Sequence, residues 1–204
     1  MNPLQVLGVI TLGYLLGAIP VGVLASRWLV GVDPREGGSR NVGFTNVLRV
    51  AGTTAGVITL IGDMGKGAAA VVAAQVILRS GSEDWVLAAG GAAILGHLFS
   101  VFLRLKGGKG VATALGVFFA LDPILGASLV LIWLGSALLW RTSSLAAIVA
   151  FGSLPVISWI RQPRPLMLAF AVGVTALIAY RHAANIRRLL AGTEPKFRVR
   201  PNPG

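Results

Sequence analysis

Long apolar stretches recur along the chain, and this feature limits the possible folds more than any other. A helix needs about 20 apolar residues to cross the roughly 30 Å hydrocarbon core of a bilayer. Hydrophobic residues make up 55% of the 204 residues and charged residues only 12%, which is too few to cover a soluble protein of this size. We therefore predict an all-α integral membrane protein, built as a single domain over residues 1–204.

Seven segments are apolar enough to be candidate membrane spans. The fourth is short and ends at Asp122 and Pro123, so a half-span or a re-entrant piece is an alternative for it. No basic region precedes the first apolar stretch, so we expect that stretch to remain as a span rather than to be a cleaved signal. The predicted spans are approximately 4–25, 54–78, 84–103, 110–121, 122–140, 143–160 and 165–181, followed by an interfacial tail over 182–204.

The basic residues predict how this bundle is oriented. Fourteen of the 18 Lys and Arg residues fall in segments 26–50, 104–109 and 181–204 or at Arg141, which share one side in a seven-span arrangement. Basic loops remain in the cytoplasm, so the N-terminus is expected outside and the C-terminus inside. The net charge of +11 then serves the anionic inner leaflet and anionic substrates rather than nucleic acid.

A polar segment at 37–49 is the first of three that this orientation brings to the cytoplasmic side. Its hydroxyls, amides and guanidinium suit a phosphate or a polyol. A helix that begins near Phe44 would place Thr45 and Arg49 on one face. A plain turn and helix cap is the alternative, above all for Asn46. The candidate residues are Ser39, Asn41, Thr45, Asn46 and Arg49.

A glycine-rich basic loop at 106–110 precedes another predicted helix. Glycines allow backbone N–H groups to turn toward an anion, the helix N-terminus adds partial positive charge, and lysines add full charges. The pattern is not a Walker A motif, so nucleoside triphosphate hydrolysis is disfavoured. A flexible basic loop is the alternative. The candidates are Lys106, Gly107, Gly108, Lys109 and Gly110, with Thr113 in the first helical turn.

Isolated polar residues mark the spans themselves. Asp63 and Lys66 lie three residues apart inside an apolar segment, either as functional charges or as an internal ion pair. His97 lies near the end of the third span, where a structural role is the alternative. His182 and Asn185 lie three residues apart at the mouth of the last span. With no cysteine and two histidines, no metal site is expected.

Three segments, in this order, resemble the bacterial acyl-phosphate:glycerol-3-phosphate acyltransferase family, PlsY. They are residues 39–49, KGGKGVATALG at 106–116, and HAANIRRL at 182–189 with GTEP at 192–195. DMGK at 63–66 and GHLFSVFL at 96–103 extend the resemblance over most of the chain. Arg40 and Phe44 stand where the family has glycine and alanine, and Ser100 where proline is common.

The resemblance implies an enzyme of the bacterial cytoplasmic (inner) membrane with its active site facing the cytoplasm. Such an enzyme transfers a fatty acyl group from acyl phosphate to the 1-hydroxyl of sn-glycerol 3-phosphate and yields lysophosphatidic acid and inorganic phosphate, the first step of phospholipid synthesis. Neither a cofactor nor an obligatory protein partner is expected.

Site residues follow from the motifs. The resemblance implies catalytic roles for Ser39, Asn41, Arg49, Lys109, His182 and Asn185, and substrate contacts from Thr45, Asn46, Gly107, Gly108, Gly110 and Glu194. From the residue pattern we add Lys66, His97, Lys106 and Thr113 as substrate contacts.

Two questions stay open at this point. The general base is either His182 or a substrate phosphate oxygen, whose second pKa is about 6. A membrane carrier or channel for an organic phosphate anion is the rival function, and a scaffold that binds anionic headgroups is a third.

Overall fold

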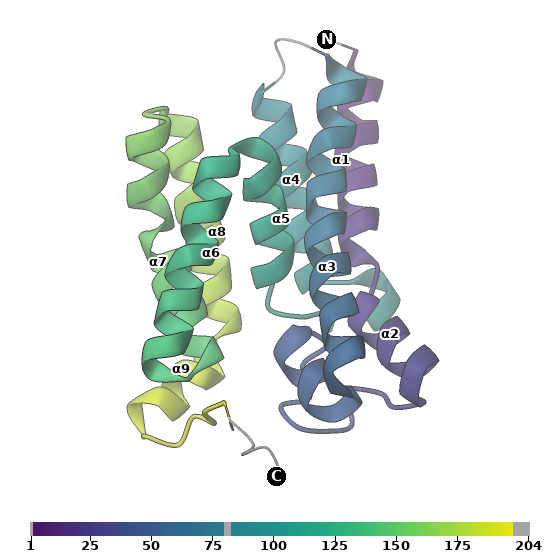
Figure 1. Ribbon diagram of the computed structural model, residues 1–204. Coiled ribbons are helices and arrows are strands. Elements are labelled where there is room, and N and C mark those ends of the chain that lie inside the picture. The colour runs from purple at the N-terminus through teal and green to yellow at the C-terminus, as the bar shows by residue number, and fades with distance from the viewer. Residues whose placement is uncertain (1, 80–82, 198–204) are drawn as a thin grey trace.

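The computed structural model describes residues 2–79 and 83–197. Within these ranges all regular structure is helical (Figure 1). The predicted tail over 182–204 therefore lies partly outside the described residues. The helices are α1 (Pro3–Ala18), α2 (Val21–Val30), α3 (Phe44–Leu78), α4 (Glu83–Leu98), the short 3-10 helix η1 (Val101–Leu103), α5 (Val111–Leu121), α6 (Pro123–Trp140), α7 (Ser143–Arg161), α8 (Pro165–Arg181) and α9 (Ala183–Leu190).

The helices form two groups that stand side by side (Figure 1). In the first group α1 packs on α4 and α3 packs on α5; in the second α7 packs on both α6 and α8. The groups meet along α5 with α6 and along α4 with α8. Of the described helices, five segments are long and apolar enough to cross a membrane, or six if the bent pair of α8 and α9 is one span, and α5 is a shorter apolar helix. The expected all-helical architecture is thus confirmed.

The predicted first span, 4–25, is broken at Pro20 into α1 and the start of α2. Proline has no N–H to continue a helical ladder, so carbonyls at the end of α1 need other partners. The Lys66 ammonium supplies one by donating to the Ile19 carbonyl at 2.7 Å. A charge from α3 thereby secures the end of α1.

Close packing of α1 on α4 depends on Gly13 and Gly17. A Cβ at Gly17 would collide with the Ala93 carbonyl, and one at Gly13 would lie too close to the Ala89 carbonyl. Two small residues spaced four apart allow such an approach between helices in a membrane. Gly13 and Gly17 therefore set the close approach of α1 to α4.

Helix α3 begins at Phe44, as the sequence predicts, and continues to Leu78. Gly52 interrupts it with φ of 85°, a conformation that favours glycine. The polar turn of helix after Phe44 and the predicted span 54–78 are therefore two parts of one element. This arrangement places Thr45, Asn46 and Arg49 on the first turns of a long helix, and the rest of segment 37–49 in the loop that precedes it.

A large apolar core fixes α5 against its neighbours. Phe118 of α5 is fully buried and its ring centroid lies 5.7 Å from that of Phe170 in α8. Large apolar side chains on the outer faces remain exposed, for example Leu138 at 79% and Ile160 at 75%. Such surfaces suit lipid rather than water.

Candidate active site

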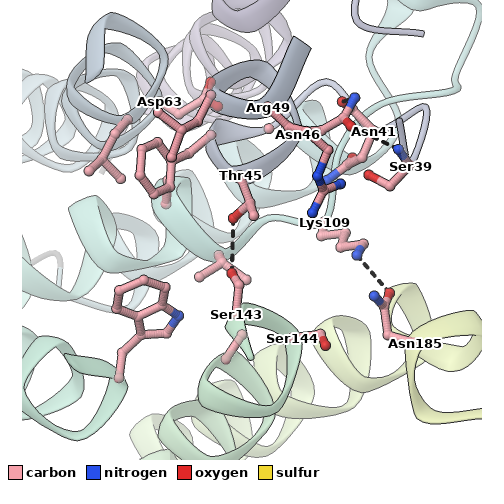
Figure 2. A pocket seen from close by; sticks show the side chains of 18 of the residues that line it. Ser39, Asn41, Thr45, Asn46, Arg49, Asp63, Lys109, Ser143, Ser144 and Asn185 are labelled. Atoms are coloured by element: carbon pink, nitrogen blue, oxygen red, sulfur yellow. Dashed lines mark hydrogen bonds between the residues drawn. The ribbon is translucent and has the colours of Figure 1, made fainter. Parts of the chain in front are cut away.

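A cavity of about 1380 Å³ lies between the two helix groups. One part of its wall is polar and another is apolar, and side chains from both groups point into it (Figure 2). The apolar wall consists of Leu60, Met64, Leu115, Phe119, Val130, Trp133 and Leu134. Of the expected site residues, the cavity brings together Ser39, Asn41, Thr45, Asn46, Arg49, His97, Lys109, Gly110, His182, Asn185 and Glu194.

Asn46 acts as the scaffold of the loop before α3. Its Oδ1 accepts the Ser39 N–H at 2.8 Å, and its Nδ2 donates to the carbonyls of Pro34 (2.8 Å), Gly37 (3.2 Å) and Asn41 (2.9 Å). The side chain is 1% exposed. We expected Asn46 to contact substrate; its amide is instead engaged in holding the loop, which matches the turn-and-cap alternative.

Thr45 lies one residue before Asn46 and faces the cavity. Its hydroxyl and that of Ser143, at the start of α7, share a hydrogen bond of 2.9 Å (Figure 2). Arg49 follows one helical turn later and also lines the cavity, so the shared face expected for Thr45 and Arg49 is present. The bond to Ser143 joins α3 of the first helix group to α7 of the second.

The glycine loop is built differently from the phosphate cradle that we expected. The Gly107 N–H donates to the Leu98 carbonyl at 3.1 Å and the Gly108 N–H to the His97 carbonyl at 3.0 Å. A Cβ at either glycine would collide with His97. The expectation that these two N–H groups face an anion is therefore corrected. Glycine is required here because the loop packs directly on the end of α4.

The other end of the loop does offer groups to an anion. Gly110 has φ of 86° and starts α5, and the first residues of α5, Val111 and Ala112, line the cavity. N–H groups in the first turn of a helix lack intrahelical partners and attract anions. The junction with α5, rather than the middle of the glycine loop, is therefore the part of this segment that borders the cavity.

Lys109 points across the cavity from this junction. Its ammonium donates to the Asn185 Oδ1 of α9 at 2.6 Å (Figure 2). Burial lowers the pKa of Lys109 to about 8; the Glu194 carboxylate opposes this shift, and the positive charge of Arg188 adds to it. At neutral pH Lys109 still carries most of its charge.

His182 follows the last residue of α8 and is 2% exposed. Its Nδ1 lies 2.8 Å from the Ile178 carbonyl, which can only accept, so Nδ1 carries the proton and Nε2 is an acceptor. Burial, together with the positive charge of Lys109, lowers the pKa of His182 to about 4. The imidazole is therefore neutral at physiological pH.

Glu194 ties the segment after α9 to the cavity wall. Its carboxylate accepts hydrogen bonds from the Ser144 hydroxyl, the Asn185 Nδ2 and the Arg188 Nε, each at 2.6 Å. Burial alone would raise the pKa of Glu194, but these hydrogen bonds outweigh it and lower the pKa. By accepting from the Asn185 Nδ2, the carboxylate orients the amide so that its Oδ1 faces Lys109.

The sequence matches the family model described as glycerol-3-phosphate acyltransferase over residues 7–192. The chain belongs to this family. Among its relatives, the glycerol-3-phosphate acyltransferase of Geotalea daltonii is 45% identical over 185 residues, covering 91% of this chain and 94% of the relative. That of Rubrobacter xylanophilus is also 45% identical, over 197 residues and 96% of both chains.

Two crystal structures of PlsY, an integral membrane glycerol 3-phosphate acyltransferase, share the fold at 40% identity. The glycerol 3-phosphate form superposes with a TM-score of 0.89 and covers 95% of this chain and 96% of that one. The lysophosphatidic acid form has a TM-score of 0.87 and covers 95% of both chains.

In this member of the family, five expected substrate contacts lie outside the cavity wall. Lys66 is buried, with its Nζ 2.8 Å from the Asp63 Oδ1, and it lines only a small neighbouring cavity. Thr113 is fully buried and Lys106 is exposed. The other two are Gly107 and Gly108, which pack on His97 as described.

Three residues that the sequence did not single out line the cavity or support its glycine loop. Ser143 and Ser144 enter the wall at the start of α7. Arg181 donates to the carbonyls of Gly107 (2.7 Å) and Gly108 (3.0 Å). Ser143 and Ser144 are two adjacent serines shortly after Arg141, a pattern that does not indicate a site. Arg181 could have been recognised in the sequence only by its position next to His182.

Proposed function

We propose that the protein transfers a fatty acyl group from acyl phosphate to the 1-hydroxyl of sn-glycerol 3-phosphate, giving lysophosphatidic acid and inorganic phosphate. The observation that best supports this function is the composition of the cavity wall. Its polar wall holds Lys109 and Arg49 near hydroxyl and amide groups, and its apolar wall continues from there between α3, α5 and α6. A phosphorylated polar molecule and a fatty chain need these two environments side by side.

The family and its structures support this choice of substrates. The related PlsY was crystallised in a glycerol 3-phosphate form and in a lysophosphatidic acid form. Those molecules are the proposed acceptor and product. Acyl phosphate as the donor follows from the resemblance of the three sequence motifs.

We infer direct transfer without an acyl-enzyme. The glycerol hydroxyl attacks the acyl carbonyl, the bond from the carbonyl carbon to the phosphate oxygen breaks, and inorganic phosphate leaves. Lys109 and Arg49 neutralise the departing phosphate, while Ser39, Asn41 or Asn185 donate to the carbonyl oxygen in the transition state.

A substrate phosphate oxygen is the proposed acceptor of the hydroxyl proton. A phosphate with a second pKa of about 6 is a stronger base than an imidazole with a pKa of about 4. His182 then serves through Nε2 as a hydrogen-bond acceptor for the second free hydroxyl of glycerol 3-phosphate, which orients the acceptor while the attacking hydroxyl gives its proton to the phosphate. Its fixed Nδ1–H bond to Ile178 supports this role.

For the membrane arrangement we propose seven crossings, by α1, α3, α4, α5, α6, α7 and α8. The described chain passes back and forth between the two ends of the bundle in this order (Figure 1). The N-terminus is placed outside and the C-terminus in the cytoplasm, because the basic segments collect near α2 and α9. The cavity mouth then faces the cytoplasm of a bacterial inner membrane.

The decisive experiment is a product assay. Purified protein in phospholipid vesicles is incubated with palmitoyl phosphate and glycerol 3-phosphate, and lysophosphatidic acid and inorganic phosphate are quantified. Equal amounts of the two products support the transferase, and glycerol in place of glycerol 3-phosphate should give little product. Uptake of glycerol 3-phosphate into sealed vesicles without product would contradict the proposal and favour a carrier.

A further inference from the structure

A cluster of three ionisable side chains lies next to the glycine loop. Asp63 and Lys66 come from α3, and His97 comes from the last turn of α4. The Asp63 Oδ1 lies 2.8 Å from the Lys66 Nζ and 3.5 Å from the His97 Nδ1. All three residues are at most 7% exposed.

Buried charges are costly unless they are paired, and inside a membrane helix they indicate a function. Here the cluster pairs its own charges, because Lys66 forms an ion pair with Asp63, and its ammonium also donates to the Ile19 carbonyl. Lys66 does not reach the large cavity, whereas Asp63 and His97 form part of its wall. The arrangement is therefore suited to supporting a neighbouring element rather than to gripping a substrate with Lys66.

The element that it supports is the glycine loop. The backbone of His97 accepts the Gly108 N–H at 3.0 Å. The imidazole packs so closely on Gly108 that a Cβ at this position would collide with the Nε2 edge of the ring. The Asp63 Oδ1 lies 3.5 Å from Nδ1 on the other side of the ring, so the imidazole is packed between α3 and the loop.

The loop is held from outside as well. Arg181 donates to the carbonyls of Gly107 and Gly108 and lies 5.7 Å from the centroid of the Phe99 ring. Lys109 directly follows Gly108 in the chain, and its ammonium donates a hydrogen bond to Asn185. If the glycine loop moved into the volume that the His97 imidazole occupies, Lys109 would therefore move with it.

We propose that Asp63, Lys66 and His97 form a positioning site that fixes the distance of the glycine loop from the end of α4. In this way the site aligns Lys109 with Asn185 and with the phosphate of the substrate. The inference rests on the proposed acyl transfer, since it assigns these residues to that reaction through the placement of Lys109. Misplacing a positioning group by about 1 Å can cost on the order of 100-fold in rate.

The first test is a double-mutant cycle on kcat/KM for glycerol 3-phosphate with His97→Ala and Lys109→Met. We expect His97→Ala alone to lower kcat/KM by about 30- to 100-fold. In the Lys109→Met background the same change should cost less than about threefold, because the group it positions is gone. An equal loss in both backgrounds would refute the inference.

The second test measures the chemical reactivity of the Lys109 amine and needs no enzymatic turnover. Lysines of the protein in vesicles are labelled with limiting trinitrobenzenesulfonate, and labelling at each lysine is quantified by mass spectrometry. We expect Asp63→Asn and His97→Ala to change the labelling of Lys109 by about fivefold or more and to leave the exposed Lys106 unchanged. Unchanged labelling of Lys109 would overturn the inference.

Tyr14→Phe is the matched control for a purely structural effect. It removes a hydrogen bond of 2.8 Å to the Phe99 carbonyl in the same part of α1 and α4, without touching the loop. This variant should leave Lys109 labelling and kcat/KM within about twofold of wild type. The same changes in Tyr14→Phe as in His97→Ala would contradict a specific positioning role.

A variant that does not fold and a wild-type protein that lacks activity can both be distinguished from failure of the inference. Should His97→Ala fail to fold, Gly108→Ala presses the loop away from the ring and should alter Lys109 labelling in the same way; unchanged labelling would again refute the inference. If wild-type protein makes no lysophosphatidic acid, the proposed function fails, while the labelling comparison still decides whether the cluster positions Lys109.

Discussion

The ammonium of Lys109 and the amide oxygen of Asn185 lie 2.6 Å apart and join the two helix groups across the cavity. Lys109 precedes α5 of the first group, and Asn185 belongs to α9 of the second. Glu194 holds the other end of the same amide. In the proposed reaction, a phosphate that binds Lys109 must share it with Asn185 or displace that bond, at the junction between the two groups.

Replacement of Lys109 by methionine should remove most of the activity. The variant keeps the apolar stem but loses the charge that faces the phosphate. We expect kcat/KM to fall by about 10²- to 10³-fold, measured as lysophosphatidic acid formed in vesicles. Arg104→Met, which removes an exposed cation from the same basic segment, is the control and should stay within about twofold; a comparable loss there would indicate general surface charge instead.

Activity should decline in alkaline solution because Lys109 loses its proton. With a pKa of about 8, the charged fraction falls about tenfold per pH unit above that value, and kcat/KM reports the free enzyme. Arginine keeps its charge to beyond pH 12, so Lys109→Arg should retain a flat profile to higher pH, at a lower plateau. A wild-type profile that stays level to pH 10 would contradict the assignment.

The role of His182 can be separated from that of the phosphate base. His182→Asn should lower kcat by about 10- to 100-fold and leave an acidic limb near pH 6 in place, because the substrate phosphate produces it. A phosphonate analogue of glycerol 3-phosphate, with a higher second pKa, should move that limb upward. Loss of the limb in His182→Asn, or near-wild-type turnover in His182→Ala, would count against this division of roles.

Asn46→Ala should destabilise the loop before α3. The change leaves several buried backbone groups without their amide partner, and each such loss costs about 1–3 kcal/mol. We expect a lower thermal midpoint in detergent and a higher KM for glycerol 3-phosphate, since Ser39 loses its anchor. Asn46→Asp keeps the oxygen that accepts from Ser39 but sets a buried carboxylate oxygen against three carbonyls, so it should be at least as destabilising as Asn46→Ala.

Packing of α1 on α4 provides a test of the fold. Gly17→Val places a side chain against the Ala93 carbonyl and should destabilise the protein by about 1–3 kcal/mol or more. Gly8 lies in the same helix with no atom near its Cβ position, so Gly8→Val should leave the thermal midpoint within about 2 °C. Equal effects of the two changes would show that helix propensity alone decides the outcome.

The sequence predicted the helices well because apolar length and polar interruption are local signals. The start of α3 at Phe44 and the end of α5 before Asp122 both follow the prediction. The break between α1 and α2 was missed, although Pro20 marks it. In an apolar stretch a proline can be accommodated within a helix or can end it, and here the partners offered by Lys66 and Ser100 decide.

For the site, the sequence identified most of the residues that line the cavity but not the role of each one. Lys109, His182 and Asn185 were recognised as a set and do meet at one cavity. Gly107, Gly108 and Asn46 were expected to face substrate, yet they build the loops. Whether an amide or a backbone N–H points outward depends on distant carbonyls such as those of His97 and Pro34, which no local pattern reveals.

The bonds made by Asn46 have a consequence for selectivity. Because one amide holds four points of the loop from Pro34 to Asn41, the loop reaches its shape during folding and pays no ordering entropy when a ligand arrives. A rigid wall of this kind discriminates by refusing molecules that do not fit, rather than by adapting to those that do. An alcohol of the wrong length should be rejected at entry, even where its phosphate is well matched to Lys109.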